Sequence, residues 1–386
     1  LEPLMEQAIN RVPELANAEI RRITTTAESF TPDNMYIMGE APGMKKVYTA
    51  CGMNSSGILC GAGVGKKMAE WIVEGYPKSG HIWEADNRRC FSWMMNKHWL
   101  RDRAPETPGN LYGSHFPFKQ FETARNMRMS PFHDRLAERG ACFGQLFGSE
   151  RANWFAPEGV EPEYEYSFHR QNWFDYSAAE HMAVRENVGI YDLSSMANFI
   201  MQGNDALSIL QNVCGNDVDV PIGKVVYTQM LNAHGGIEAD ITVTRLEKDK
   251  FFIVTAGATA LRDFDYIERA IPQDAHAFLV DMSSAYAMLG VMGPNARKLM
   301  EKVSDADLSN EGFPYGTAKE ISVGYATPLA IRMSFVGELG WELYVPTEFA
   351  ADMFDALMAA GREFDVKLVG LHALDSLRLE RGFRHW

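Results

Sequence analysis

The pattern that most constrains the fold is a series of short apolar segments, separated by turn signals, between residues 197 and 257. Three of them, VVYTQMLN, GGIEADITVTRL and FFIVTAG, have the composition of successive strands. Two neighbouring segments, AAEHMAVRENV and DALSILQNV, instead carry apolar residues at helical spacing. Because strands and helices are mixed along one stretch of chain, the sequence predicts an α+β fold.

Length and charge narrow the classes of function. At roughly 150 residues per domain, a chain of 386 residues predicts two to three domains. Acidic residues outnumber basic ones by 51 to 37, and the net charge of −14 disfavours binding to nucleic-acid phosphates. No stretch approaches the ~18 uninterrupted apolar residues of a membrane-spanning helix. We therefore expect neither a nucleic-acid partner nor a membrane span.

The five cysteines do not form a recognisable framework. They are Cys51, Cys60, Cys90, Cys142 and Cys214, an odd number without CxxC spacing. The ten histidines include no HExxH pair. We expect no disulfides, no metal site and a reducing compartment.

The two ends of the chain are abrupt. The first residue is Leu1, and the last is Trp386 at the end of DSLRLERGFRHW, a run that predicts a helix without a capping glycine or a polar tail. These ends predict a piece of a longer protein.

The first 75 residues predict a helix, strands and a glycine-rich loop. Residues 1–15 have helical spacing interrupted by Pro13, and β-rich runs follow in AEIRRITTTAESFTPDN and MYIMGEAPGMKKVYTACG. The next run, GMNSSGILCGAGVGKKMAEWIVEG, predicts a glycine loop leading into a helix. Such a loop lets a flat or anionic ligand approach the backbone and the helix N-terminus. A tight connection that needs glycine only for packing explains the same residues, and GAGVGKK lacks the spacing of a phosphate loop.

Two further segments carry candidate functional side chains. In VVYTQMLNAHGGIEADITV, a turn at the double glycine brings Tyr227 and Asp240 onto neighbouring strands, where a phenol and a carboxylate can hold an amine-bearing heteroaromatic ligand and manage a proton. In FVGELGWELYVP, two glycines flank Glu338, whose carboxylate can accept two hydrogen bonds from an amino-pyrimidinone edge. Solvent-exposed strand and turn residues would show the same patterns.

Several longer segments resemble one enzyme family. NMYIMGEAPGMKKVYTACGMNSSGILCGAGVGKKMAEWIVEG is similar to the carboxyl-terminal part of the flavin domain in FAD-dependent amine oxidoreductases of the sarcosine and dimethylglycine dehydrogenase group. YDLSSMANF, VYTQMLNAHGGIEADITVTRL, MSFVGELGWELYVP and LDSLRLERGFRHW resemble its folate-binding domain, which is related to aminomethyltransferase. The resemblance implies the end of an FAD-dependent oxidoreductase domain over residues 1–85, a bridge over 86–150 and an incomplete folate-binding domain over 151–386.

This resemblance implies oxidative N-demethylation of sarcosine, with FAD as hydride acceptor and tetrahydrofolate as acceptor of the one-carbon unit. Asp240 would be the catalytic carboxylate that accepts a proton beside the folate. The implied cofactor contacts are Asn54, Gly57 and Ile58 at the flavin, and Tyr227, Asp240 and Glu338 at the folate. An electron acceptor such as electron-transfer flavoprotein is implied as partner, in the mitochondrial matrix of a eukaryote or the cytoplasm of a bacterium.

The chain also departs from the family pattern. Ala239 replaces one member of a tandem acidic pair, Phe335 replaces a tyrosine and Leu374 replaces an arginine of the aminomethyltransferase. No GxGxxG follows an early strand, so the dinucleotide-binding half lies outside this chain. Dimethylglycine dehydrogenase and a non-catalytic homologue, similar to the regulatory subunit of pyruvate dehydrogenase phosphatase, are the alternative functions.

Overall fold

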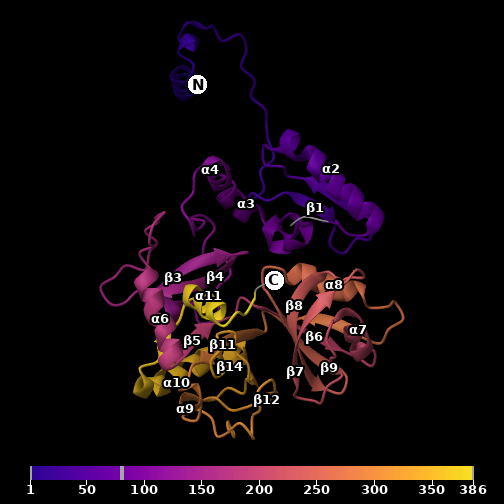
Figure 1. Ribbon diagram of the computed structural model, residues 1–386, viewed down its shortest axis with the longest axis vertical. Coiled ribbons are helices and arrows are strands. Elements are labelled where there is room, and N and C mark those ends of the chain that lie inside the picture. The colour runs from indigo at the N-terminus through magenta and orange to yellow at the C-terminus, as the bar shows by residue number, and fades with distance from the viewer. Residues whose placement is uncertain (1, 79–81, 385–386) are drawn as a thin grey trace.

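We describe the protein from a computed structural model, whose described residues are 2–78 and 82–384. Its N-terminal part extends away from two lobes, each built on one sheet (Figure 1). The mixture of antiparallel sheets and helices confirms the predicted α+β fold.

The first thirty residues form little regular structure. Helix α1 (Glu2–Arg11) is followed by a 3-10 helix over Pro13–Asn17, as the position of Pro13 predicts. Residues 18–30 form neither helix nor strand, so the strand predicted in AEIRRITTTAESF is wrong. Ile20 and Ile23 are 47% and 62% exposed, and a strand there would need a ladder partner that the neighbouring strands do not supply.

A strand pair and a long helix follow. Strands β1 (Ile37–Glu40) and β2 (Tyr48–Cys51) form an antiparallel pair, and α2 spans Gly57–Glu74 as predicted. Trp71 of α2 packs on β1 at Gly39, where a Cβ atom would lie 2.5 Å from the indole ring. Glycine is therefore required at the contact that holds the helix against the strands.

The segment before the first lobe contains short elements rather than a core of its own. It comprises helices α3 (Lys97–Arg103), α4 (Glu106–Tyr112) and α5 (His133–Ala137), then the hairpin of β3 (Ala141–Leu146) and β4 (Ser149–Phe155). Phe132 and Leu136 are buried in the core of the six-stranded sheet. The hairpin runs across residue 150, where a domain boundary is predicted.

One lobe is built on a five-stranded antiparallel sheet whose order is β10-β6-β9-β8-β7. Helices α7 (Ala206–Val213) and α8 (Ala260–Arg269) pack on its core, which includes Phe199, Phe251 and Ile253. The strands are β6 (Ala197–Gln202), β7 (Val225–Leu231), β8 (Ile237–Glu247), β9 (Lys250–Thr255) and β10 (Phe278–Asp281). The strands predicted in the segment from 197 to 255 are confirmed.

The other lobe is built on a six-stranded sheet of order β12-β13-β14-β11-β5-β15, in which only β15 and β5 are paired in parallel. Its strands are β5 (Gly189–Asp192), β11 (Tyr286–Met292), β12 (Ala318–Glu320), β13 (Leu329–Ile331), β14 (Gly340–Pro346) and β15 (Lys367–Leu368). Its helices are α6 (Phe174–Glu186), α9 (Ala296–Met300), α10 (Ala350–Gly361) and α11 (Leu371–Glu380). The C-terminal helix ends at Glu380, and Gly382 has φ +70°, so the expectation of a helix without a glycine stop is wrong.

The two sheets share a buried apolar cluster. Phe252 of β9 packs edge to face on Tyr344 of β14, with ring centroids 5.0 Å apart. Val225, Val254, Met288 and Ile331 complete the contact. The lobes are thus joined by a continuous hydrophobic core.

The described residues form neither a membrane-spanning helix nor a cluster of metal ligands. In 2–78 and 82–384, no helix has the length and apolar character needed to cross a membrane. The same part of the chain holds no group of three or more His, Cys, Asp or Glu side chains that could hold a metal ion. All five cysteines are free thiols.

Candidate functional site

The β7–β8 hairpin has one buried and one accessible face. Val226, Thr228 and Met230 of β7 point into the core, whereas Tyr227 between them is half exposed. In β8, Asp240 lies between the buried residues Ala239 and Ile241. Since side chains alternate along a strand, Tyr227 and Asp240 lie on the accessible face of the same sheet.

The structure brings these two predicted site residues together. Tyr227 pairs with Thr242 in the ladder, so Asp240 is its diagonal neighbour, and the Tyr227 hydroxyl donates a hydrogen bond of 2.9 Å to Asp240 Oδ2. Partial burial and the adjacent carboxylate raise the pKa of Tyr227, so the phenol stays protonated and continues to donate. The hydrogen bond fixes one carboxylate oxygen of Asp240, and the described hydrogen bonds of the chain leave its Oδ1 without a protein donor.

Glu338 lies elsewhere, in the turn that leads into β14. Its carboxylate accepts a hydrogen bond of 2.9 Å from Arg185 of α6, which also donates to the carbonyl oxygens of Val336 and Leu377. Among the described residues, no hydrogen bond or ion pair joins Glu338 to Tyr227 or Asp240. Arg185 holds the turn against α6 and α11, and the linear sequence carried no signal for this role.

The rest of the turn is stabilised by the residues that follow α11. Phe335 stacks on Phe383, with ring centroids 5.8 Å apart. Gly337 has φ +77°, and a Cβ atom there would lie 2.2 Å from the Arg381 side chain. Glu338 is therefore presented by a fixed turn rather than a free loop, as a binding role requires.

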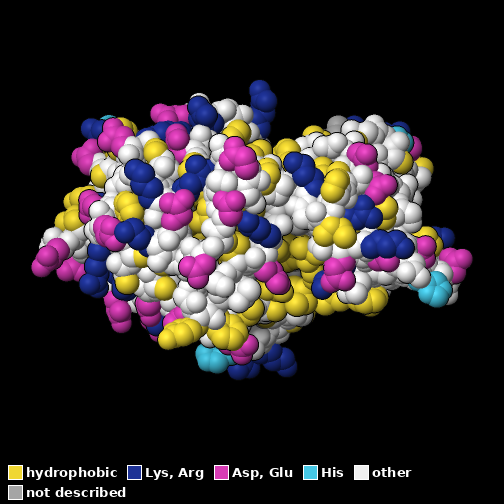
Figure 2. Space-filling view, turned by 90° about the horizontal axis from the view of Figure 1, so that it is seen from below, with side chains coloured by type: hydrophobic (Ala, Val, Ile, Leu, Met, Phe, Trp, Pro, Cys, Tyr) yellow, Lys and Arg dark blue, Asp and Glu magenta, His cyan; other side chains and the backbone are white. Residues whose placement is uncertain are grey.

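The surface between the two lobes is hollowed. Figure 2 shows hydrophobic side chains gathered in the hollow between the lobe of the five-stranded sheet and the lobe of the six-stranded sheet. A flat, partly apolar ligand such as a pterin fits a surface of this kind when a few polar groups fix its orientation. Tyr227 and Asp240, joined by a hydrogen bond on the accessible face of the five-stranded sheet, are polar groups of the kind that fix such a ligand, so these residues are compatible with folate.

The predicted flavin-contacting loop precedes α2. Asn54 is buried with φ +49°, and its amide is hydrogen-bonded on both sides to Thr31: Oδ1 accepts from Thr31 N at 2.7 Å, and Nδ2 donates to Thr31 Oγ1 at 3.1 Å. Ile58 is fully exposed, and Gly57 opens the helix. The Asn54 side chain therefore fixes the loop, while Gly57 and Ile58 are free for contact.

The N-terminus of α2 can interact with an electron-rich ligand. This 18-residue helix has Ser56 at its N-cap position without a side-chain capping bond, which leaves its first N–H groups without an internal acceptor. A cavity of about 530 Å³ beside it is lined by residues that include Asn54, Ser56 and Leu59. Exposed N–H groups at the positive end of a helix suit the electron-rich part of a flavin, so this end of the chain is compatible with FAD.

Three family models match successive parts of the chain. Residues 1–71 match "FAD dependent oxidoreductase", and residues 74–130 match "FAD dependent oxidoreductase central domain". Residues 132–386 match "GCVT N-terminal domain". The chain belongs to the family of FAD-dependent oxidoreductases joined to an aminomethyltransferase-like domain. FAD and tetrahydrofolate are the cofactors of this family.

Curated relatives of this family match nearly the whole chain. The 4-methylaminobutanoate oxidase (formaldehyde-forming) of Paenarthrobacter nicotinovorans is 44% identical, covering 99% of this chain and 46% of that protein. Human mitochondrial sarcosine dehydrogenase is 35% identical, and the match covers 99% of this chain and 46% of that protein. The mouse pyruvate dehydrogenase phosphatase regulatory subunit is also 35% identical, and the match covers 100% of this chain and 44% of that protein. The chain spans about half the length of these relatives.

A solved structure supports the fold of the two lobes. The glycine cleavage system aminomethyltransferase T from Bartonella henselae matches with a TM-score of 0.56 at 24% identity, covering 67% of this chain and 64% of that one. At this identity the likeness establishes the fold alone.

Proposed function

We propose that the protein to which this chain belongs oxidises the N-methyl group of a small amino acid and transfers the one-carbon unit to a folate. The observation that carries the folate half is the Tyr227–Asp240 hydrogen bond on an accessible sheet face. The observation that supports the oxidative half is the uncapped, exposed start of α2 within the oxidoreductase match.

Bound FAD would supply hydride acceptance, and bound tetrahydrofolate would supply the nucleophilic nitrogen. Asp240 would accept the proton released from that nitrogen, because Oδ1 is free while Oδ2 is held by Tyr227. Tyr227 orients the carboxylate, and Glu338, held by Arg185, would accept hydrogen bonds from the pterin edge. Asn54, Gly57 and Ile58 would contact the flavin, and the hydrogen bonds of Asn54 to Thr31 would also fix their loop.

Sarcosine is the substrate that we propose. A second candidate, 4-methylaminobutanoate, is supported by the 44% identity to the oxidase of that name, against 35% for human sarcosine dehydrogenase. Dimethylglycine differs from sarcosine by one methyl group and has relatives at about 31% identity. Electron-transfer flavoprotein as acceptor is part of the same proposal. We also propose that the protein is located in the mitochondrial matrix if the source is a eukaryote, and in the cytoplasm if the source is a bacterium.

The test uses the full-length protein with each of the three amines, a redox dye and tetrahydrofolate. We expect dye reduction to be fastest with sarcosine and the methylene folate to form in equal amount. Reduction fastest with 4-methylaminobutanoate would move the substrate assignment to the second candidate. Absence of dye reduction with all three amines, in protein that retains FAD, would favour the non-catalytic homologue.

The Asp240 role is tested by Asp240→Asn, with Asp274→Asn as a matched exposed control. Because a positioned general base contributes roughly 10²–10⁴ in rate, we expect methylene folate to form at least ~100-fold more slowly while dye reduction stays within about twofold. Tyr227→Phe should give a smaller loss, about tenfold, since only one hydrogen bond disappears. An unchanged rate of methylene folate formation in Asp240→Asn would rule out the assigned role.

A further inference from the structure

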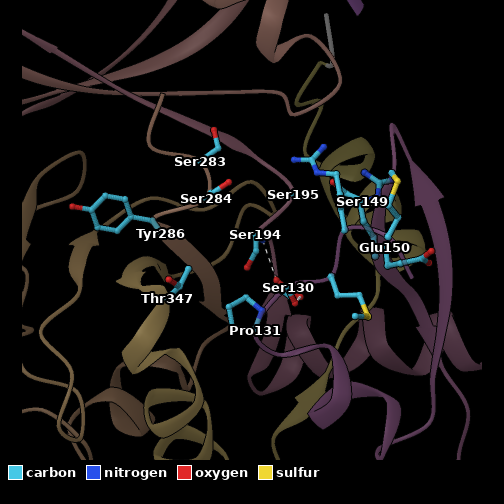
Figure 3. A pocket seen from close by; sticks show the side chains of 15 residues that line it. Ser130, Pro131, Ser149, Glu150, Ser194, Ser195, Ser283, Ser284, Tyr286 and Thr347 are labelled. Carbon is cyan, nitrogen blue, oxygen red and sulfur yellow. Dashed lines mark hydrogen bonds between the residues drawn. The ribbon is translucent and has the colours of Figure 1, made fainter. Parts of the chain in front are cut away.

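A cavity of about 390 Å³ lies where the bridging segment meets the two sheets, remote in sequence from every residue assigned above. Its walls come from residues 127–131, 149–151, 192–195 and 283–286, together with Thr347 at the end of β14. Figure 3 shows the side chains of these segments converging on one space from several directions.

The lining is unusually rich in hydroxyl groups. The serines are Ser130, Ser149, Ser194, Ser195, Ser283 and Ser284. Some have protein partners: Ser130 donates to Asp192, and Ser283 donates to Asp281. In the part of the chain that the structure describes, the hydroxyls of Ser149, Ser195 and Ser284 make no hydrogen bond to protein. These three groups are therefore available as donors to a ligand.

Two guanidinium groups line the same cavity without a carboxylate partner. Arg151 of β4 makes no hydrogen bond or ion pair to any described residue, and its Nε is shielded from solvent. Burial lowers the pKa of Arg151 to about 10, so the group is still charged at neutral pH. Among the described residues, Arg128 donates to the carbonyl oxygen of Phe147, at 3.2 Å, and lies over the ring of Trp93. Burial lowers the pKa of Arg128, and the carboxylate of Asp281 acts on it electrostatically but forms no ion pair with it.

The carboxylates of the lining do not neutralise these charges. Glu150 is engaged by Arg125, with a contact of 2.6 Å, and accepts from the backbone N–H of Asn126. Asp192 accepts from Ser130 and from the backbone N–H of Ser194, and its burial raises its pKa. Because Arg151 has a shielded Nε and no ion-pair partner among the described residues, an anion in the cavity would stabilise it.

We propose that this cavity binds the phosphate group of a small phosphate monoester. Arg151 and Arg128 supply the charge, and the hydroxyls of Ser149, Ser195 and Ser284 donate to the phosphate oxygens. A tetrahedral anion can use donors from several walls at once, whereas the two coplanar oxygens of a carboxylate are satisfied by one guanidinium fork. The volume leaves room for a short organic group against Pro131 and Tyr286.

Isothermal titration calorimetry on the full-length protein tests the proposal, with inorganic phosphate, glycerol phosphate and succinate as probes. We expect both phosphates to bind and succinate to bind at least tenfold more weakly. Tighter binding of succinate would overturn the assignment to phosphate, and the absence of binding by all three probes would overturn the site.

Substitutions of the lining residues test whether phosphate binds in this cavity. Arg151→Gln should weaken phosphate binding at least tenfold, whereas Arg170→Gln, at an arginine whose side chain is 66% exposed, should leave it unchanged. If Arg151→Gln fails to fold, Ser195→Ala and Arg128→Gln should each weaken binding by severalfold. Phosphate affinity that is unaltered in the variants that fold would contradict the proposal.

Discussion

The N-terminal segment (residues 2–78 and 82–96) and the C-terminal region (residues 132–384) differ in how they bury their apolar residues. In the C-terminal region two large clusters fill the space between sheets and helices, with Phe354, Trp341 and Phe251 fully buried. In the N-terminal segment, α1 buries no residue and α2 buries only Met68 and Trp71. Ile58, Leu59 and Val73 of α2 are more than three quarters exposed.

This difference shows that the two regions obtain their stability differently. The C-terminal region has the apolar burial to fold on its own account. The N-terminal segment is held by a few contacts to the rest of the chain, among them Arg88 to Asp265 at 3.2 Å and the tilted rings of Tyr76 and His234, whose centroids lie 4.3 Å apart. Its exposed helix face has the composition of a surface that packs against further protein.

The largest expected effect would come from the core of the C-terminal region. Phe354→Ala removes a fully buried ring that packs on Phe132, and we expect the free energy of unfolding to fall by about 3–5 kcal/mol. Ile72→Ala on α2, at a residue 55% exposed, should change it by less than about 0.5 kcal/mol. Urea denaturation measures the free energy of unfolding of both variants. Equal losses would contradict the difference in apolar burial between the two regions.

A buried carboxyl in the C-terminal region should make its stability depend on pH. Burial raises the pKa of Glu342 to about 7, although Tyr344 donates a hydrogen bond to it. The folded state therefore binds more protons than the unfolded state between pH 4.5 and about 7, and the free energy of unfolding should fall by about 2–3 kcal/mol as pH rises through this window. Glu342→Gln should reduce the slope of the profile, measured as thermal melts from pH 4.5 to 8. The remaining slope comes from Glu180 and Asp263, because burial also raises their pKa values, to about 7 and about 6. A profile unchanged by the substitution would contradict this origin.

The contact between the two regions should contribute less. Arg88 bridges Asp86 and Asp265, and Asp265 keeps a second ion pair with Arg269 at 2.7 Å. Arg88→Met should therefore cost about 2 kcal/mol, below the full penalty for breaking a buried ion pair. The change should also speed proteolytic cleavage before residue 82 more than cleavage within the sheets. A double-mutant cycle with Asp265→Asn measures the coupling, and a coupling energy near zero would mean that the pair does not join the regions.

The smallest effect on stability is expected at Ile58. Because its side chain is fully exposed, Ile58→Asp should leave the free energy of unfolding of this chain, measured by urea denaturation, unchanged within about 0.5 kcal/mol. In the full-length protein the same change should lower flavin content, measured by absorbance, if Ile58 contacts the flavin. Met44→Asp, at a residue of the β1–β2 connection that is 57% exposed, is the control because it adds the same single negative charge.

Sequence reasoning succeeded where local pattern decides structure. Alternation across the double glycine predicted that Tyr227 and Asp240 lie side by side, because a hairpin fixes register over a short distance. It failed at residues 18–30, where β-rich composition lacks a partner strand. Arg185 and Arg151 were not predicted, since their roles depend on segments far away along the chain. The domain boundaries at 85 and 150 stay predictions. So do the catalytic role of Asp240 and all the cofactor contacts, which are Asn54, Gly57, Ile58, Tyr227, Asp240 and Glu338.

The strand order has a consequence for synthesis on the ribosome. All five strands of the first sheet lie between residues 197 and 281, inserted between β5 and β11 of the second sheet. That sheet can pair as soon as its residues emerge, whereas β5 must wait for β11 and then for β15, whose Lys367 pairs with Gly189. Since long-range pairing is slow, β5 and the buried face around it would stay open at least until β11 has been synthesised. A pause in synthesis before residue 286 would prolong the exposure of this strand.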